Sequence, residues 1–189
     1  MNLKTVEFKT VAQMFNQLTS EHSSKNFYYY KKQDEWIGLS GSAIRSTVKD
    51  LTFALKSLDI KNGHNVALLS NNSPNWAMSD YGIICSGAAT VSIYPTLIAS
   101  QIEYILKDSN SKLIFVENQE QCDKIISIWK NCKDLKNIVV MDDSYSGDDE
   151  KIINFQNFID LGTDFQGKDD KTFEDMIGLI KSEDLSSSI

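Results

Sequence analysis

The sequence predicts an α/β fold: a parallel sheet with helices on both faces, built from β–α–β crossovers, after an N-terminal helix and β-hairpin. The main observation is the stretch 65–96, where two short apolar runs flank a segment with helical spacing. Ser73 and Pro74 supply an N-cap and a first-turn proline, and Gly87 supplies a residue that tolerates positive φ where the helix ends. Strands joined through a helix in this way run parallel.

Residues 1–39 are expected to form the helix and the hairpin. Thr10 precedes apolar side chains at helical spacing, namely Val11, Met14, Phe15 and Leu18. Two aromatic and apolar runs, 27–30 and 36–39, then flank a polar turn, which is typical of a β-hairpin.

Residues 40–141 are expected to form the parallel core. A helix begins at Ser40 or Ser42 and is followed by the crossover at 65–96. Two more helix–strand pairs complete the pattern, with strands at 112–117 and 137–141. The alternation predicts four parallel strands with helices between them.

Residues 142–189 read as an acidic helical segment. After an exposed loop at 142–150, the spacing of Ile152, Phe155 and Phe158 predicts one short helix, and Phe173 and Met176 belong to a second. This segment holds thirteen acidic and four basic side chains, a balance of −9, whereas residues 1–141 carry +2 and the whole chain −7. An acidic segment on a near-neutral body argues against nucleic-acid binding and is typical of a solvated surface.

The composition excludes several other classes of protein. Three cysteines and two distant histidines match no spacing for a metal site, and free thiols favour a reducing compartment. No signal peptide is apparent, and no apolar run approaches the roughly 20 residues that cross a bilayer. We therefore expect a cytoplasmic location without a transmembrane segment, and peripheral membrane contact stays open.

The residues predict a place where a ligand could bind, at the carboxyl end of a strand, but no group of catalytic residues. Asn71, Asn72 and Ser73 follow a predicted strand at its carboxyl end, where open α/β sheets bind ligands, although a simple turn and cap explain them as well. Asp80 has no acid or base placed beside it by motif, so solvation or a local helix pair is expected for its carboxylate. No glycine-rich loop with a following lysine is present to hold phosphates.

Five motifs in order resemble the N-terminal part of an AMP-forming acyl-CoA synthetase, a member of the adenylate-forming superfamily. They are 55–70 (LKSLDIKNGHNVALLS), 71–76 (NNSPNW), 87–96 (GAATVSIYPT), 101–109 (QIEYILKDS) and 112–117 (KLIFVE). The form of residues 93–96 looks most like the long-chain fatty acid branch. Asp59, His64 and Asn75 depart from the family pattern at surface turns or a helix start.

The resemblance implies a ligase that uses a long-chain fatty acid, ATP, Mg and CoA. It also implies that the chain is a partial domain that is inactive alone. Residues 183–185 resemble a short family motif that directly precedes a Ser/Thr/Gly-rich phosphate loop, and the sequence ends at Ile189. No catalytic, cofactor or metal residue is therefore assigned here. Asn71, Asn72, Ser73, Tyr94 and Thr96 are expected to lie near the substrate.

Two other readings remain open on the residues. One is a self-standing, flavodoxin-like ligand-binding domain that uses the rim at 71–73. The other is a non-catalytic interaction module whose acidic segment meets a basic partner. If the chain is instead part of a larger scaffold, we expect an exposed apolar patch and self-association of the isolated polypeptide.

Overall fold

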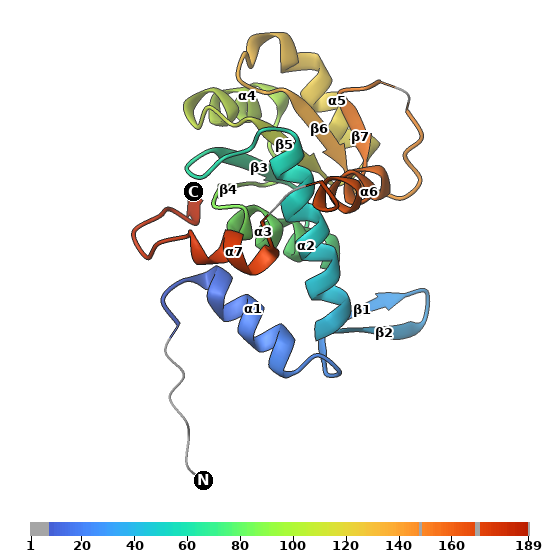
Figure 1. The fold of residues 1–189 in the computed structure, drawn as a ribbon. Coiled ribbons are helices and arrows are strands. Elements are labelled where there is room, and N and C mark those ends of the chain that lie inside the picture. Colours follow the sequence, from blue (N-terminus) through green and yellow to red (C-terminus); the bar gives the residue numbers. More distant parts are fainter. Residues whose placement is uncertain (1–7, 148, 169–170, 189) are drawn as a thin grey trace.

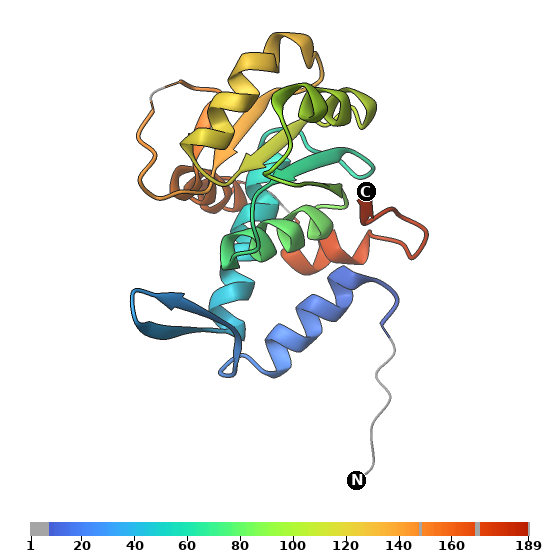
Figure 2. The same ribbon diagram turned by 180° about the vertical axis from the view of Figure 1, so that it is seen from behind.

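A six-stranded parallel sheet forms the centre of the molecule in the computed structural model, which describes residues 8–147, 149–168 and 171–188 (Figure 1). Its strand order is β7-β6-β5-β3-β4-β8, and every neighbouring pair is parallel. A separate antiparallel hairpin, β1–β2, projects from the body beside α2 (Figures 1 and 2). The predicted α/β class is therefore confirmed.

The elements follow one another as the alternating pattern requires. The strands are β1 Asn26–Lys32, β2 Glu35–Ser40, β3 Asn65–Leu69, β4 Ala89–Ile93, β5 Leu113–Val116, β6 Asn137–Val140, β7 Ile152–Asn154 and β8 Ser187–Ser188. The α-helices are α1 Val11–Glu21, α2 Gly41–Ser57, α3 Pro74–Cys85, α4 Ala99–Asp108, α5 Gln119–Ile128, α6 Phe155–Gln166 and α7 Phe173–Gly178, and a 3₁₀ turn, η1 Trp129–Asn131, follows α5.

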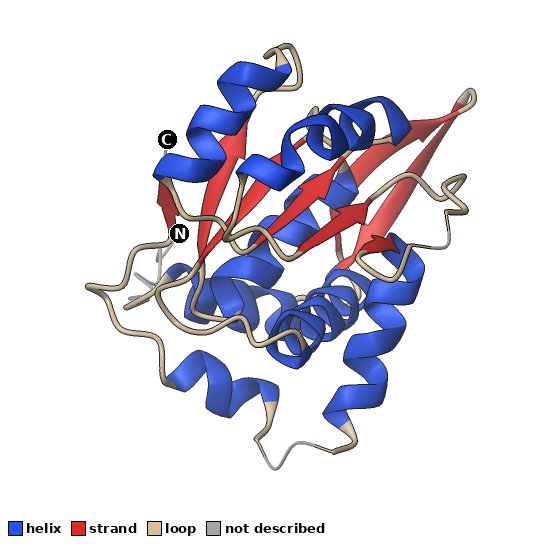
Figure 3. Ribbon diagram, turned by 90° about the horizontal axis from the view of Figure 1, so that it is seen from above, coloured by secondary structure: helices blue, strands red, loops and turns tan. Residues whose placement is uncertain are grey.

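Helices cover both faces of the sheet, because successive strand residues point to opposite sides (Figure 3). Val66 and Leu68 of β3 pack in one cluster with side chains of α1, α2, α3, α6 and α7. Ala67 and Leu69 of the same strand pack in a second cluster with α4 and α5. Burial on both faces explains why the core strands are continuous apolar runs rather than alternating ones.

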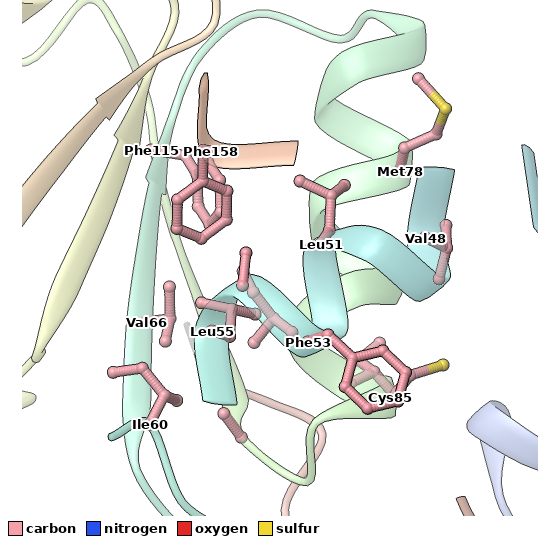
Figure 4. Close-up of a cluster of buried hydrophobic side chains, with 14 of the residues drawn as sticks. Val48, Leu51, Phe53, Leu55, Ile60, Val66, Met78, Cys85, Phe115 and Phe158 are labelled. Carbon is pink, nitrogen blue, oxygen red and sulfur yellow. The ribbon is translucent and has the colours of Figure 1, made fainter. Parts of the chain in front are cut away.

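Helix α2 is the centre of the first cluster. Leu51 and Leu55 on α2 are completely buried, as are Phe115 on β5 and Phe158 on α6 (Figure 4). Fully burying side chains of this size stabilises the fold by roughly 1.5–3 kcal/mol each. The layer made by α2, α3 and α6 is therefore as much a part of the core as the sheet itself.

The local predictions at helix ends are confirmed. The hydroxyl Oγ1 of Thr10 accepts a hydrogen bond from the Gln13 amide, and Oγ of Ser73 accepts one from the Trp76 amide, at 3.1 and 3.0 Å. Ser40, the first of the two predicted starts, caps α2. Gly87 takes a φ of 82°, as the turn after α3 requires.

Two short edge strands extend the four that the sequence predicts. Ile152, predicted to start a helix, lies instead in β7, where it pairs with Ile138 of β6, and α6 begins only at Phe155. The β-branched pair Ile152 and Ile153 favours a strand, and Asn154 then caps the helix. At the other edge, Ser187 of β8 pairs with Thr90 of β4.

Candidate functional site at the carboxyl ends of β3 and β4

The chain reverses its direction of travel across the sheet at β3, which lies between β4 and β5. After β3 the chain enters α3 on one face, and after β4 it enters α4 on the other face. The topological switch point therefore lies between β3 and β5, and the carboxyl ends of β3 and β4 lie beside it. Open α/β sheets bind ligands outside the carboxyl ends of their strands.

A cavity of about 530 Å³ lies at the carboxyl ends of β3 and β4. Its uncharged polar lining comes from the segment after β3, from β4 and from β8, and consists of Ser70, Asn71, Asn72, Ser92 and Ser187. The volume falls within the range of small-molecule sites, about 300–1,000 Å³.

Aromatic and apolar side chains form the other wall. Trp76 comes from the first turn of α3, Ile93 ends β4, and Tyr94 and Pro95 follow it. The Tyr94 side chain is 75% exposed, so it borders the mouth rather than the floor. The cavity therefore combines an apolar wall with a few polar groups, as ligand sites commonly do.

A carboxylate outside the cavity fixes the orientation of Asn71. Oε2 of Glu117 accepts hydrogen bonds from the Asn71 backbone amide at 2.9 Å and from its side-chain Nδ2 at 2.8 Å. The Ser70 hydroxyl donates to the Asn71 carbonyl oxygen at 2.7 Å. Glu117 takes one of the two Nδ2 hydrogens of Asn71, so the second hydrogen and the amide oxygen stay available for other hydrogen bonds.

Asp80 is the one charged side chain that lines the cavity within the described ranges. Its Oδ1 accepts a hydrogen bond of 2.6 Å from the Thr90 hydroxyl on β4. Burial raises the pKa of the Asp80 carboxyl above its usual value, and the hydrogen bond from Thr90 opposes that rise. No other hydrogen bond or ion pair to Asp80 occurs among residues 8–147, 149–168 and 171–188.

The structure brings together three of the five residues that the sequence singled out. Asn71, Asn72 and Tyr94 line the cavity. Ser73 points its hydroxyl at the backbone of α3 as a cap, and Thr96 is an exposed residue of the turn before α4. Neither contributes to the lining.

The sequence reasoning missed Trp76 and Asp80 as lining residues. It expected solvation or a local helix pair for Asp80, whereas the carboxyl is half-buried and bonded to a neighbouring strand. A signal was present, because residue 80 lies four positions after Trp76 and four before Ile84, on the inward side of the predicted helix.

The described parts of the chain lack two further features. No three side chains of the His, Cys, Asp or Glu type lie close enough together to hold a metal ion. No helix combines the length and apolar character that crossing a bilayer requires.

Comparison with known families decides the relationship. The model of the AMP-binding enzyme family matches residues 15–172, which is most of the sequence. The chain belongs to this family. The resemblance to AMP-forming acyl-CoA synthetases carried by the five motifs is thereby confirmed at the level of the family.

Curated relatives of this chain include long-chain fatty acid ligases. The long-chain-fatty-acid–CoA ligase ACSBG1 of Homo sapiens is 28% identical over 155 residues, which cover 82% of this chain and 21% of the relative. The ligase ACSBG2 of Xenopus laevis is 26% identical over the same number of residues, with the same coverage. The chain thus spans about a fifth of the length of the curated relatives it matches.

Solved structures show the same fold. An anthranilate CoA ligase, AuaEII, in complex with anthranoyl-AMP, is 26% identical with a TM-score of 0.70, and the match covers 82% of this chain and 29% of that one. The coronafacic acid ligase of Pectobacterium brasiliense is 18% identical with a TM-score of 0.69, covering 80% of this chain and 29% of that one, and this likeness shows the fold alone.

Proposed function

We propose that these 189 residues form the N-terminal portion of an ATP-dependent, AMP-forming long-chain fatty acid–CoA ligase. The observation that carries the proposal is the family match over residues 15–172, together with curated relatives that are long-chain fatty acid–CoA ligases. Such a ligase activates a fatty carboxylate with Mg-ATP as an acyl-adenylate, releasing pyrophosphate. It then joins the acyl group to the CoA thiol and releases AMP.

The cavity at the carboxyl ends of β3 and β4 does not fit the phosphates of ATP or CoA. Asp80 presents a carboxyl to it, and no lysine, arginine or histidine of the described ranges lines it. Phosphate binding needs basic side chains or a loop of free amides, and the sequence holds no glycine-rich loop with a following lysine. We therefore assign the groups that hold these phosphates, and the Mg that ATP brings with it, to a part of the ligase outside these residues.

The role that we propose for this chain is that of a scaffold beside the acyl substrate. Asn71, Asn72, Ser73, Tyr94 and Thr96 lie on the same edge of the sheet and are proposed as the residues nearest to the substrate. Because long acyl chains partition into bilayers, the proposal includes a cytoplasmic enzyme that contacts the membrane peripherally.

The test compares the native protein with the isolated chain. An antibody raised against residues 8–147 captures the protein from its own cells, and the captured material is assayed for palmitate-dependent exchange of pyrophosphate into ATP. We expect exchange in this material and none with the recombinant 189-residue chain, and omission of palmitate gives the background rate. Exchange by the recombinant chain alone, or captured protein without exchange, would contradict the proposal.

A further inference from the structure

Residues 179–188, which follow α7 and include β8, form a flap that lies on the body without burying a side chain. None of these residues is buried, and Leu179 and Leu185 are 58% and 61% exposed. By contrast, α7 buries apolar side chains in the core cluster that surrounds α2. The apolar contacts that fix the C-terminal part of the described chain therefore stop at α7.

Arg45 holds α7 in place just before the flap begins. Its Nε donates to Oδ1 of Asn16 on α1 at 2.9 Å, and its Nη2 donates to Oε1 of Glu174 on α7. The same guanidinium lies 5.4 Å from the centre of the Phe173 ring. Gly178 ends α7, and a β-carbon there would meet nothing within 4 Å. The chain can therefore bend at this residue without disturbing a neighbour.

Few contacts tie the flap to the body beyond Gly178. Nδ2 of Asn62, in the turn after α2, donates to Oδ2 of Asp184 at 3.0 Å, and this is the one side-chain hydrogen bond between flap and body among the described residues. β8 adds only two residues to the sheet, and the Thr90 amide donates to the carbonyl oxygen of Ser186 at 3.0 Å. A segment with so few buried apolar contacts opens at low cost.

Two cavities interrupt the packing under the flap. One, of about 130 Å³, separates residues within 180–186 from the start of α1 and the turn after α3. The other, of about 330 Å³, lies between Leu179, Ile180 and the turn after α2. Both are large enough to admit water, so polar groups of the flap can exchange protein contacts for water.

We propose that residues 179–188 open and close as a unit about Gly178 while α7 stays docked. The opening uncovers the edge of β4 and removes one wall of the cavity at the carboxyl ends of β3 and β4, because Ser187 of β8 lines that cavity. The flap thus controls access to the candidate site. This inference goes beyond the ligase function and does not depend on it, since the motion belongs to the folded chain without substrate.

Hydrogen exchange at two adjacent amides of β4 tests the proposal on the 189-residue chain. The Thr90 amide donates to Ser186 in the flap, whereas the Ala89 amide donates to the carbonyl oxygen of His64, at 2.9 Å. Both residues are buried. After correction for intrinsic rates, NMR should show the Thr90 amide exchanging about tenfold faster than that of Ala89, or more. Low urea should speed Ala89 more steeply than Thr90, because local opening exposes little surface. Equal protection and equal urea dependence, or slower exchange at Thr90, would overturn the proposal.

Asn62→Ala is the matched variant, because it removes the bond to Asp184 and leaves β4 intact. The loss of a hydrogen bond to a charged group predicts about tenfold faster exchange at Thr90. Asn131→Ala is the control, since it removes a similar exposed bond, 3.2 Å long, from Nδ2 to Oε2 of Glu103. That bond persists when the flap opens, so the Thr90 rate should not change.

Unchanged exchange at Thr90 in Asn62→Ala would contradict the proposal. The Met176 amide, which donates to the Thr172 carbonyl oxygen within α7, reports on the hinge. We expect it to stay better protected than Thr90. Exchange of both amides with the same protection would mean that α7 leaves together with the flap, and would overturn a hinge at Gly178.

Discussion

Gly162 of α6 lies directly against the backbone of Asp50 in α2. A β-carbon at position 162 would stand 1.8 Å from the Asp50 carbonyl oxygen and 2.9 Å from the amide nitrogen of Ala54. Both contacts are to backbone atoms, which cannot swing aside as the end of a long side chain can. The two helices can therefore approach this closely only because residue 162 has no side chain.

Replacing Gly162 by alanine is expected to destabilise the fold. Alanine favours a helix over glycine by about 1 kcal/mol, but overpacking a close backbone contact costs typically 1–3 kcal/mol and occasionally more. A clash at 1.8 Å belongs at the upper end, so we expect a net loss of about 2 kcal/mol. The measurement is the free energy of unfolding in urea.

Gly178→Ala provides the control for this substitution. Gly178 ends α7, and a β-carbon there would meet nothing within 4 Å. We expect a change of no more than about 0.5 kcal/mol, in the stabilising direction. If both variants unfold at the same urea concentration, the close approach of α2 and α6 is not what holds glycine at position 162.

The sequence could predict the parallel sheet but not this helix contact. Alternation of apolar runs with helical spacing is a local signal, and it identified the elements between Ser40 and Met141 correctly. Gly162 and Asp50 are far apart in the chain, and no periodicity reports which two helices touch. The prediction that Ile152 starts a helix was wrong for a related reason, since three residues are too few to distinguish a strand from the start of a helix.

The candidate site was predictable only where a general rule applies. The rule that ligands bind at the carboxyl ends of parallel strands drew attention to Asn71 and Asn72, which do line the cavity. Asp80 could not be placed by this rule, because it comes from the second turn of α3. Its role depends on the neighbouring strand β4, where Thr90 meets it, and the strand order is not visible in the sequence.

A second prediction concerns the aromatic pair between the sheet and α6. Phe115 and Phe158 meet edge to face, with ring centroids 5.4 Å apart, and both are fully buried (Figure 4). Phe158→Ala should cost about 3–5 kcal/mol, because it removes buried area and leaves a cavity. A cycle that combines Phe158→Leu with Phe115→Leu should give a coupling of about 0.5–1.5 kcal/mol for the ring contact. Additive effects of the two substitutions would contradict a specific contact between the rings.

The three thiols are expected to be unreactive in the folded chain. Cys85, Cys122 and Cys132 are buried and free, and burial raises the pKa of each, that of Cys122 to about 11. Since the thiolate is the reactive form, a chromogenic disulfide reagent at neutral pH should label fewer than one thiol quickly in the native state and three in urea. Rapid labelling of a single cysteine without denaturant would locate an opening that the packing does not show.

The last prediction uses the half-buried carboxyl of Asp80. Burial raises its folded-state pKa above the ordinary value of 3.8, and the hydrogen bond from Thr90 offsets only part of that rise. The native state therefore keeps this proton at a pH where the unfolded chain has lost it. The stability that Asp80 contributes is fully present below its unfolded pKa and is lost as the pH rises through the folded pKa.

The stability of Asp80→Asn relative to the original chain should then increase as the pH rises. Asparagine does not titrate, so the free energy of unfolding of the variant, minus that of the original chain, should increase from pH 4 toward pH 7. Asp50 has a raised pKa as well, also through burial, but it is present in both proteins and its effect cancels in the difference. The measurement is a urea titration of both proteins at each pH. A difference that falls with rising pH would mean that the Asp80 carboxylate is favoured in the native state, and that a cationic partner already compensates its charge.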